Sequence, residues 1–220
     1  IRSRGLGDVY KRQILHLLND YNINKNQTSL YSAVKTLDSM FQGGIYDHIG
    51  GGFARYAVDE KWLVPHFEKM LYDNAQLMEA YLVGYQLTDN EDYLTVISQI
   101  LEWLKDEMID KGGGFYSSMD ADSEGVEGKY YVWKPEEIED ILSENDAKIF
   151  NQYYDISRSG NWEGNSIPNV IMKKASLSTL LKIPENEIAI SLEKSRLAVK
   201  EQRNSRIAPD TDDKIIVSWN

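Results

Sequence analysis

Apolar residues recur at helical spacing along most of this chain, and the helices that they predict are joined alternately by long glycine-containing loops and by short turns. Segments 29–42 and 92–109 each place apolar residues on one helical face and polar residues on the other, which is typical of outer, half-solvated helices. Segment 65–87 begins with proline and carries apolar residues around a wider arc, which predicts a more deeply buried helix. Further helices are predicted at 135–142, 146–154, 176–181 and 184–205.

The long loops form an internal repeat. Gly43-Gly44-Ile45-Tyr46 opens the loop after the first outer helix, and Gly113-Gly114-Phe115-Tyr116 opens the loop after the second. A short turn near 88–90 joins the helices between them, and this alternation places all the long loops at one end of a helical array. Aromatic, β-prone residues at 115–117 and 129–133 predict a small β-hairpin in the second loop. The expected fold class is therefore all-α: an α/α toroid with small β-hairpins in its long loops.

Composition excludes several classes of function. Among the 220 residues there is no cysteine, which rules out disulfides, thiolate catalysis and cysteine-ligated zinc within this sequence. The formal net charge of −11 repels nucleic-acid phosphates and anionic membrane surfaces, so neither is an expected partner. No apolar run approaches the roughly 18 residues of a membrane span. An acidic, cysteine-free composition favours a cytoplasmic protein, and no cofactor or metal is expected.

Segment 43–77 gathers five glycines, two histidines, aromatic rings and charges ahead of an apolar helix, a mixture that is costly unless it builds a site. The predicted helix start beside His66 would keep its imidazole neutral, so that it could accept a proton. Lys69 and Asp73 would lie on nearly the same side of that helix and point with His66 into a central cavity. Alternatively, His66 packs the helix end while Lys69 and Asp73 face water. His48 has the same two interpretations.

Aromatic rings and carboxylates in the long loops are the next candidates. Carbohydrate sites combine ring platforms with a few directional polar groups, although each ring could instead pack a loop against a helix end. The rings are Trp62, Tyr116, Tyr130, Trp133 and Trp162. The alternating Asp120, Asp122 and Glu124 resemble the start of a calcium loop, but the twelfth position of an EF-hand, which requires glutamate, is Tyr131. A hydrogen-bonded acidic turn is therefore expected, with a weaker cation site as the alternative.

Asp212 and Asp213, ahead of Lys214, could act as general acid and base if their environments separate their pKa values. Because adjacent side chains usually point in different directions, one of the two is expected to be functional and the other structural. Glu163 is a further acid on the same expected face. A glycosidase would need two carboxyl groups about 5 to 9.5 Å apart, whereas an epimerase would favour His48 and His66 as its acid/base pair.

Four stretches resemble the spermatogenesis-associated protein 20 family, a thioredoxin-domain-containing family also called YyaL-like. They are segment 43–77, GGGFYSSMDADSEGVEGKYYVW (112–133), NWEGNSI (161–167) and RIAPDTDDKIIVSWN (206–220). The resemblance implies a six-hairpin α/α barrel, similar to N-acylglucosamine 2-epimerases and several glycosidases, of which 14–220 would supply the N-terminal half. It also implies a thioredoxin-like domain as a partner in cis, and hence a chain truncated at both ends. Residues 1–13 resemble a translated transposon end from sequencing-library preparation and are expected to be a non-native leader; the alternative is a native basic helix start.

The sequence thus predicts a carbohydrate-active or carbohydrate-binding toroid that takes a small-molecule substrate, as a sugar isomerase, epimerase or glycoside hydrolase. One alternative is a noncatalytic helical module that accompanies a thioredoxin-like redox domain, and another is a metal-dependent enzyme or a different substrate. The expected catalytic residues are His48, His66, Asp73, Asp212 and Asp213. The expected substrate-binding residues are Arg55, Trp62, Lys69, Asp120, Asp122, Tyr130, Trp133, Trp162, Glu163 and Lys214.

Overall fold

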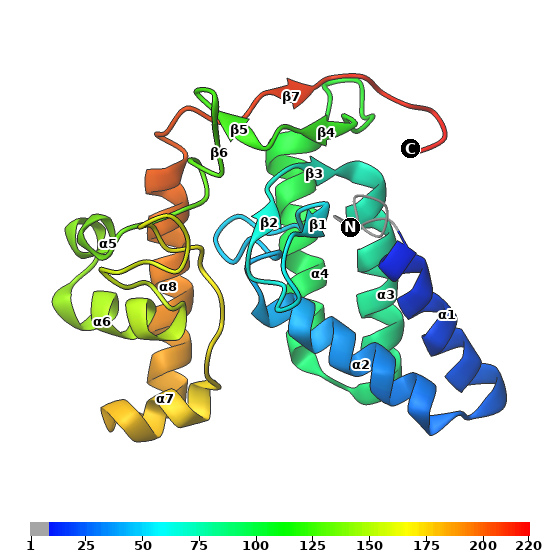
Figure 1. Ribbon diagram of the computed structural model, residues 1–220, viewed down its shortest axis with the longest axis horizontal. Helices are drawn as coiled ribbons and strands as arrows, with labels where there is room; N and C mark the ends of the chain where they lie inside the picture. Colours follow the sequence, from blue (N-terminus) through cyan, green and yellow to red (C-terminus); the bar gives the residue numbers. More distant parts are fainter. Residues whose placement is uncertain (1–8) are drawn as a thin grey trace.

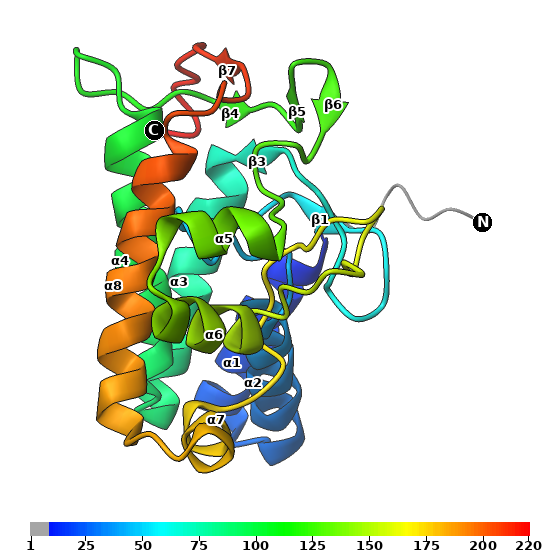
Figure 2. The same ribbon diagram turned by 90° about the vertical axis from the view of Figure 1, so that its left-hand side faces the viewer.

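A computed structural model describes residues 9–220 of the chain and is shown in Figures 1 and 2. The predicted all-α class is confirmed, with short strands in the long loops. Part of the predicted leader, 1–8, lies outside the described residues, and 9–13 form the start of α1. The helices are α1 (Val9–Asn24), α2 (Gln27–Gln42), α3 (Leu71–Thr88), α4 (Glu91–Trp103), α5 (Pro135–Ile141), α6 (Glu144–Tyr153), α7 (Lys174–Leu181) and α8 (Glu185–Arg203).

Two groups of helices, each with its own apolar core, make up the described chain. In the first lobe, α1 packs against α2 and α3, and α3 packs against α4, around side chains such as Leu37, Tyr81 and Trp103 that are fully buried. In the second lobe, α6 packs against α5, α7 and α8 around Phe150, Ile188 and their neighbours. Burial of these separate apolar faces stabilises each lobe, because burial of apolar area contributes about 25 cal/mol per Å².

Helix α8 of the second lobe runs beside α4 of the first (Figure 2), and charged side chains join the two. The α4 helix continues into a π-helical turn, η1 (Leu104–Met108), so the predicted helix 92–109 ends in a wider winding. The ion pairs between the lobes are Arg196–Glu102 at 3.5 Å, Lys200–Asp106 at 2.8 Å and Arg203–Glu107 at 4.0 Å. Ion pairs therefore join α8 to α4 and to its η1 extension.

The long loops converge at one end of the molecule, as their alternation with short turns predicts. Strands β3 (Lys69–Met70), β4 (Ser118–Met119) and β7 (Thr211–Asp212) form a three-stranded antiparallel sheet in the order β3-β4-β7 (Figure 1). Lys69 pairs with Met119, and Ser118 pairs with Asp212. Three segments far apart in the sequence thereby share one edge of the helical array.

The predicted helix at 65–87 is wrong over its first six residues. Residues 65–70 are extended, because Pro65–His66 (β2) pairs with Tyr56–Ala57 (β1) and Lys69–Met70 pairs with β4. The helix α3 starts at Leu71 instead. Proline lacks a backbone N–H, so it fits at the edge of a short strand as well as in a first helical turn. His66 is therefore not at a helix start and does not share a helical face with Lys69 and Asp73.

Two other elements differ from expectation. The hairpin of the second loop lies at β5 (Asp122–Ser123) and β6 (Val126–Glu127), inside the predicted segment but between the predicted strands. Helix α1 was not predicted, because residues 1–13 were set aside, yet Ile14 and Leu18 on it are fully buried. Asn26 caps α2 by accepting a hydrogen bond from the backbone N–H of Thr28.

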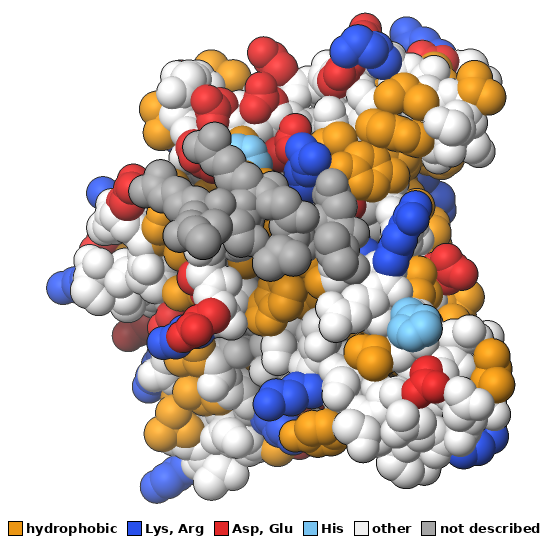
Figure 3. All heavy atoms as spheres, turned by 45° about the vertical axis from the view of Figure 1, so that its right-hand side comes forward, with side chains coloured by type: hydrophobic (Ala, Val, Ile, Leu, Met, Phe, Trp, Pro, Cys, Tyr) orange, Lys and Arg blue, Asp and Glu red, His pale blue; other side chains and the backbone are white. Residues whose placement is uncertain are grey.

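The face seen in Figure 3 intersperses hydrophobic side chains with acidic and basic ones. Within the described part of the chain, every helix is too short or too polar to cross a membrane.

Candidate functional site

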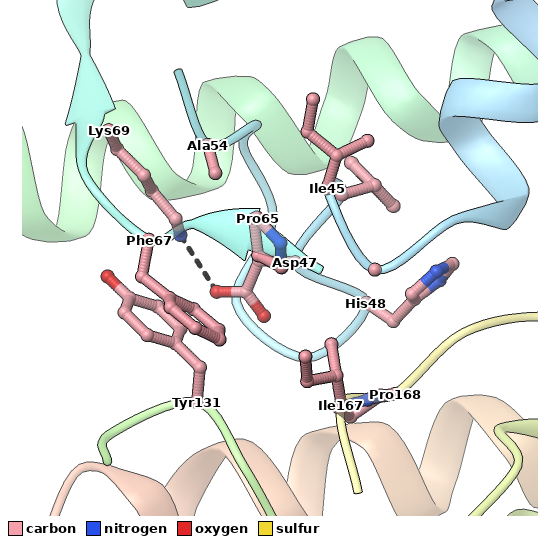
Figure 4. Close-up of a pocket in the computed structure, with 12 residues that line it drawn as sticks. Ile45, Asp47, His48, Ala54, Pro65, Phe67, Lys69, Tyr131, Ile167 and Pro168 are labelled. Carbon is pink, nitrogen blue, oxygen red and sulfur yellow. Dashed lines mark hydrogen bonds and ion pairs between the residues drawn. The ribbon is translucent and has the colours of Figure 1, made fainter. Parts of the chain in front are cut away.

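A buried ion cluster lies between the first long loop and the end of α8. The Lys69 ammonium nitrogen is 2.8 Å from one carboxylate oxygen of Asp47, and Arg203 donates to both Asp47 oxygens at 2.9 and 2.8 Å. The backbone N–H groups of Ile49 and Gly50 also donate to this carboxylate. Figure 4 shows Lys69 and Asp47 pointing toward each other beside the rings of Phe67 and Tyr131, while His48 points away from the pair.

Electrostatics keep the cluster ionised. Burial alone would raise the pKa of the Asp47 carboxyl, but Arg203 and Lys69 hold it far below its usual value. Burial lowers the pKa of the Lys69 ammonium, and the Asp47 carboxylate offsets part of that effect. For Arg203 the Asp47 charge outweighs burial and raises the pKa of the guanidinium. The cluster therefore holds two cations on one carboxylate, with Glu107 4.0 Å from Arg203.

The cavity next to this cluster is small. It has a volume of about 20 Å³, lined by Asp47, His48, Lys69 and Tyr131 among others, which is the size of a single water rather than a sugar. The glycine run packs the loop tightly: a Cβ on Gly50 would lie 1.8 Å from Nη2 of Arg203, and one on Gly51, whose φ is +82°, would lie 2.1 Å from the carbonyl oxygen of Gln99. These glycines allow the loop to pack closely against α4 and α8. We therefore interpret the ion cluster as a structural contact between the first long loop and the end of α8.

His48 is buried among rings and is neutral. Its Nε2 lies 3.1 Å from the carbonyl oxygen of Gly43, and the rings of Tyr46 and Tyr154 lie 5.1 and 5.3 Å from its own. Burial lowers the pKa of its imidazole to about 4, against the opposing effect of the Gly43 carbonyl. This environment supports the structural interpretation of His48.

An open groove of about 620 Å³ lies between the β5–β6 hairpin, the 162–165 turn and the residues after α8, and we call it the hairpin groove. Three predicted substrate-binding residues line it together: Tyr130, Trp162 and Glu163. Trp162 is half-buried against Phe67, with the two ring centres 5.4 Å apart. The hairpin groove thus combines rings with carboxylates, the combination expected of a carbohydrate site.

Two turns of the same kind flank the hairpin groove. Glu124-Gly125 joins β5 to β6 with φ values of +53° and +73°, and Glu163-Gly164 joins the bridged residues Trp162 and Asn165 with +48° and +76°. Positive φ at both central residues of a two-residue hairpin is typical of a type I′ turn. Each turn therefore presents a glutamate at the edge of the groove.

Sequence reasoning missed Glu127, which also lines the hairpin groove. Its carboxylate lies 2.7 Å from Nδ1 of His66, and the His66 ring stacks on Tyr56 with their centres 5.1 Å apart. The two side chains are 34% and 47% exposed, so this pair is open to a ligand. A sequence signal was present, since Glu127 lies between two glycines in one of the family-like stretches, but its partner is 61 residues away.

Arg206 was also missed. It donates to the backbone carbonyls of Tyr130 and Val132 at 3.0 and 2.9 Å, and its guanidinium lies 3.7 Å from the centre of the Trp133 ring. Trp133 is fully buried beneath it and lines a neighbouring surface depression rather than the hairpin groove. Behind the groove, the Arg203 guanidinium lies 4.8 Å from the ring of Tyr130, which links the groove wall to the buried ion cluster.

The other predicted residues lie elsewhere. Asp73 is fully buried and forms an ion pair with Lys11, so it neither faces water nor points with His66 into a cavity. Arg55 pairs with Glu68 at 3.2 Å. Trp62 has a φ of +62° and contacts the ring of Tyr10.

The remaining acids are held in local turns. Asp120 accepts hydrogen bonds from the backbone of Ala121 and Asp122, which is the predicted acidic turn. Over residues 9–220 no three acidic or histidine side chains are grouped so as to hold a metal ion. Asp212 pairs with Lys214 at 2.7 Å, which lowers the pKa of the Asp212 carboxyl, and Asp213 is exposed next to it. The predicted catalytic residues are thus not brought together at one point.

Comparison with known proteins gives relatives over most of the chain. Spermatogenesis-associated protein 20 of Homo sapiens is 33% identical over 213 residues, 86% of this chain and 27% of that protein, and the Mus musculus protein of the same name is 33% identical over 217 residues. An uncharacterized protein of Caenorhabditis elegans is 34% identical over 220 residues, 89% of this chain and 30% of its own length. The chain therefore spans less than a third of the length of these curated relatives.

No protein-family model matches the chain. Among solved structures, a cellobiose 2-epimerase from Spirochaeta thermophila aligns with 95% of this chain and 64% of its own, at a TM-score of 0.45 and 14% identity.

Proposed function

Homologues of this chain, about 33% identical over most of its length, are named spermatogenesis-associated protein 20, and for this member we propose a carbohydrate-binding role. The chain forms part of an α/α toroid domain whose hairpin groove holds a sugar. Trp162 supplies ring surface beside the buried Tyr130, and Glu127 and Glu163 supply carboxylates that accept hydrogen bonds from sugar hydroxyls.

One observation carries this proposal: rings and carboxylates from two separate segments, 124–137 and 162–163, line a single groove of about 620 Å³. That volume lies in the range of small-molecule sites, whereas the cavity beside Asp47 and Lys69, at about 20 Å³, is too small for a sugar. The half-buried state of Trp162 also fits, because an exposed ring face can stack on a sugar ring.

The test is a titration of the chain with a panel of mono- and oligosaccharides, followed by tryptophan fluorescence and calorimetry. We expect one or more sugars to bind and Trp162→Ala to weaken that binding about two- to tenfold, since an aromatic contact is worth about 0.5–1.5 kcal/mol. Trp219→Ala is the matched control, because Trp219 is also half-buried but lies outside the groove. Unchanged affinity in Trp162→Ala, or no binding by any sugar, would remove the proposal.

A second candidate is a noncatalytic helical module that serves a thioredoxin-like domain in the same protein. The dispersal of the predicted catalytic residues favours it: Asp73 is buried against Lys11, and Asp212 is paired with Lys214. Under this hypothesis no sugar binds, and substitutions in the hairpin groove change only the association with the redox domain.

A further inference from the structure

The carboxylates that line the hairpin groove differ in whether they have partners. Glu124 pairs with Lys129 at 2.5 Å, Glu137 with Arg206 at 2.9 Å, and Glu127 with His66 at 2.7 Å. Among the groove residues that the structure describes, Glu163 has a carboxylate that makes no ion pair or hydrogen bond. Glycoside hydrolysis requires two carboxyl groups that flank the scissile bond. Because three of these four carboxylates already have a partner, the groove does not offer two free carboxyl groups for glycoside hydrolysis.

A histidine–carboxylate pair is present instead. Strand β2 holds His66 and the stacked Tyr56 ring fixes its plane, while β6 brings Glu127 to Nδ1 from a different loop. A carboxylate that accepts the Nδ1 hydrogen leaves the lone pair on Nε2 of the neutral ring. The His66 side chain is 34% exposed and its partner Glu127 lines the groove, so a ligand bound against Glu127 lies beside the imidazole.

We propose that His66 and Glu127 form an acid–base dyad at the rim of the hairpin groove, which moves a proton between neighbouring carbons of a reducing sugar and so isomerises it. This inference rests on the proposed sugar-binding function and deepens it by naming the reaction class. His66 is the catalytic residue, since it touches the reacting atom. Glu127 is a positioning residue that acts through the imidazole.

The step balances without an oxidant or a cofactor. Nε2 of His66 takes the proton from the carbon next to the carbonyl of the open-chain sugar, and the C–H electron pair moves through that carbon to the carbonyl oxygen as an enediolate. The proton of the neighbouring hydroxyl passes to the former carbonyl oxygen, and the imidazolium returns its own proton to the former carbonyl carbon on the face from which it was taken, which gives the keto isomer. Glu127 stabilises the imidazolium that forms in between.

The first test concerns the dyad itself and needs no sugar. The chain has three histidines, so ¹⁵N-detected NMR can resolve each imidazole. We expect neutral His66 to carry its proton on Nδ1, and Glu127→Gln to reduce that preference. Glu136→Gln, at an exposed glutamate outside the groove, should leave the His66 tautomer unchanged. A His66 protonated on Nε2 in the wild-type chain would overturn the proposal.

The second test measures proton transfer in D₂O with glucose, mannose, N-acetylglucosamine and maltose. Deuterium should enter the carbon next to the carbonyl of a sugar that binds, His66→Gln should reduce the rate at least about 100-fold, and Glu127→Gln about 10- to 100-fold. Binding without deuterium incorporation, or incorporation that survives His66→Gln, would overturn the dyad alone. Failure of all four sugars to bind, with the wider panel also negative, would remove the proposed function and the dyad with it.

Discussion

Arg203, at the end of α8, holds both carboxylate oxygens of Asp47 through one guanidinium nitrogen, at 2.9 and 2.8 Å, although the two residues are 156 positions apart. The contact fastens the second lobe to the glycine-rich loop of the first. Lys69 completes the cluster from β3. Because β3 also pairs with β4, the same cluster fixes the position of the sheet that gathers the long loops.

Loss of the Asp47 charge should be strongly destabilising. Asp47→Asn would leave Lys69 and Arg203 buried without their shared counter-ion, and breaking a buried pair in this way typically costs about 3–5 kcal/mol. The free energy of unfolding from urea titrations would measure it. Asp106→Asn is the control, because its pair with Lys200 involves a carboxylate that is 55% exposed and should contribute less than about 1 kcal/mol. Equal effects of the two substitutions would contradict the role given to the cluster.

Protonation of His48 should weaken the fold as the pH falls. Its pKa is lowered from 6.5 to about 4 in the folded chain, so between these values the unfolded chain binds more protons. The stabilisation is therefore complete above about pH 6.5 and declines as the pH falls toward 4. Between pH 7 and pH 5 the loss should be about 2 kcal/mol, at 1.36 kcal/mol per pKa unit.

His48→Gln should remove that share of the pH dependence, whereas His66→Gln should leave it in place. Urea denaturation at pH 7 and pH 5 on the three proteins is the measurement. An equally steep loss of stability in His48→Gln would show that other groups cause it.

Substitution of glycine by a larger residue should destabilise the chain where the glycine run approaches Arg203. Gly50→Ala places a Cβ where Nη2 of Arg203 lies, so the guanidinium must move away from Asp47. Overpacking of this kind costs about 1–3 kcal/mol. Gly125→Ala is the contrast, since its Cβ meets nothing within 4 Å and its penalty comes from the positive φ alone. A double-mutant cycle separates the two causes: Gly50→Ala should be non-additive with Asp47→Asn, and Gly125→Ala should be additive with it.

Local signals in the sequence were sufficient for most helices. Amphipathic spacing and caps lie within a few residues of one another, so α2 and α5 begin and end within two residues of the positions predicted for them. The convergence of the long loops was also predictable, because it follows from the alternation of long and short connections. Segment 65–70 was not, since its extended conformation depends on pairing with residues 56 and 119, which no local pattern reveals.

The same distinction applies to the site. Aromatic and acidic residues in the loops that resemble the family were predictable as candidate site residues. Three of them, Tyr130, Trp162 and Glu163, do line one groove. The contacts of His66 with Glu127 and of Arg203 with Asp47 span 61 and 156 residues, so residue type alone could not identify the partners. For Asp73, helical spacing predicted which side of the helix the carboxylate lies on. It could not predict that Lys11 of α1 would bury the carboxylate and form an ion pair with it.

Glu163 should show opposite effects on stability and on sugar binding. Its φ of +48° lies in the left-handed region, which a glutamate occupies at a cost of about 1 kcal/mol, whereas Asn-Gly is the preferred pair for a type I′ turn. Glu163→Asn should therefore raise the free energy of unfolding by about 0.5 kcal/mol or more. The same change replaces a carboxylate by a neutral amide, and a charged acceptor is worth about 1 kcal/mol more than a neutral one, so affinity should fall about fivefold.

Lys182→Asn is the matched control for that substitution. Lys182 caps α7 in the left-handed conformation with a φ of +58° and lies outside the hairpin groove, so asparagine should stabilise the chain there without changing sugar affinity. Urea denaturation and sugar titration on both variants are the measurements. If Glu163→Asn is stabilising and binds sugar as well as the wild-type chain, the carboxylate is only a turn residue and the hairpin groove does not use it.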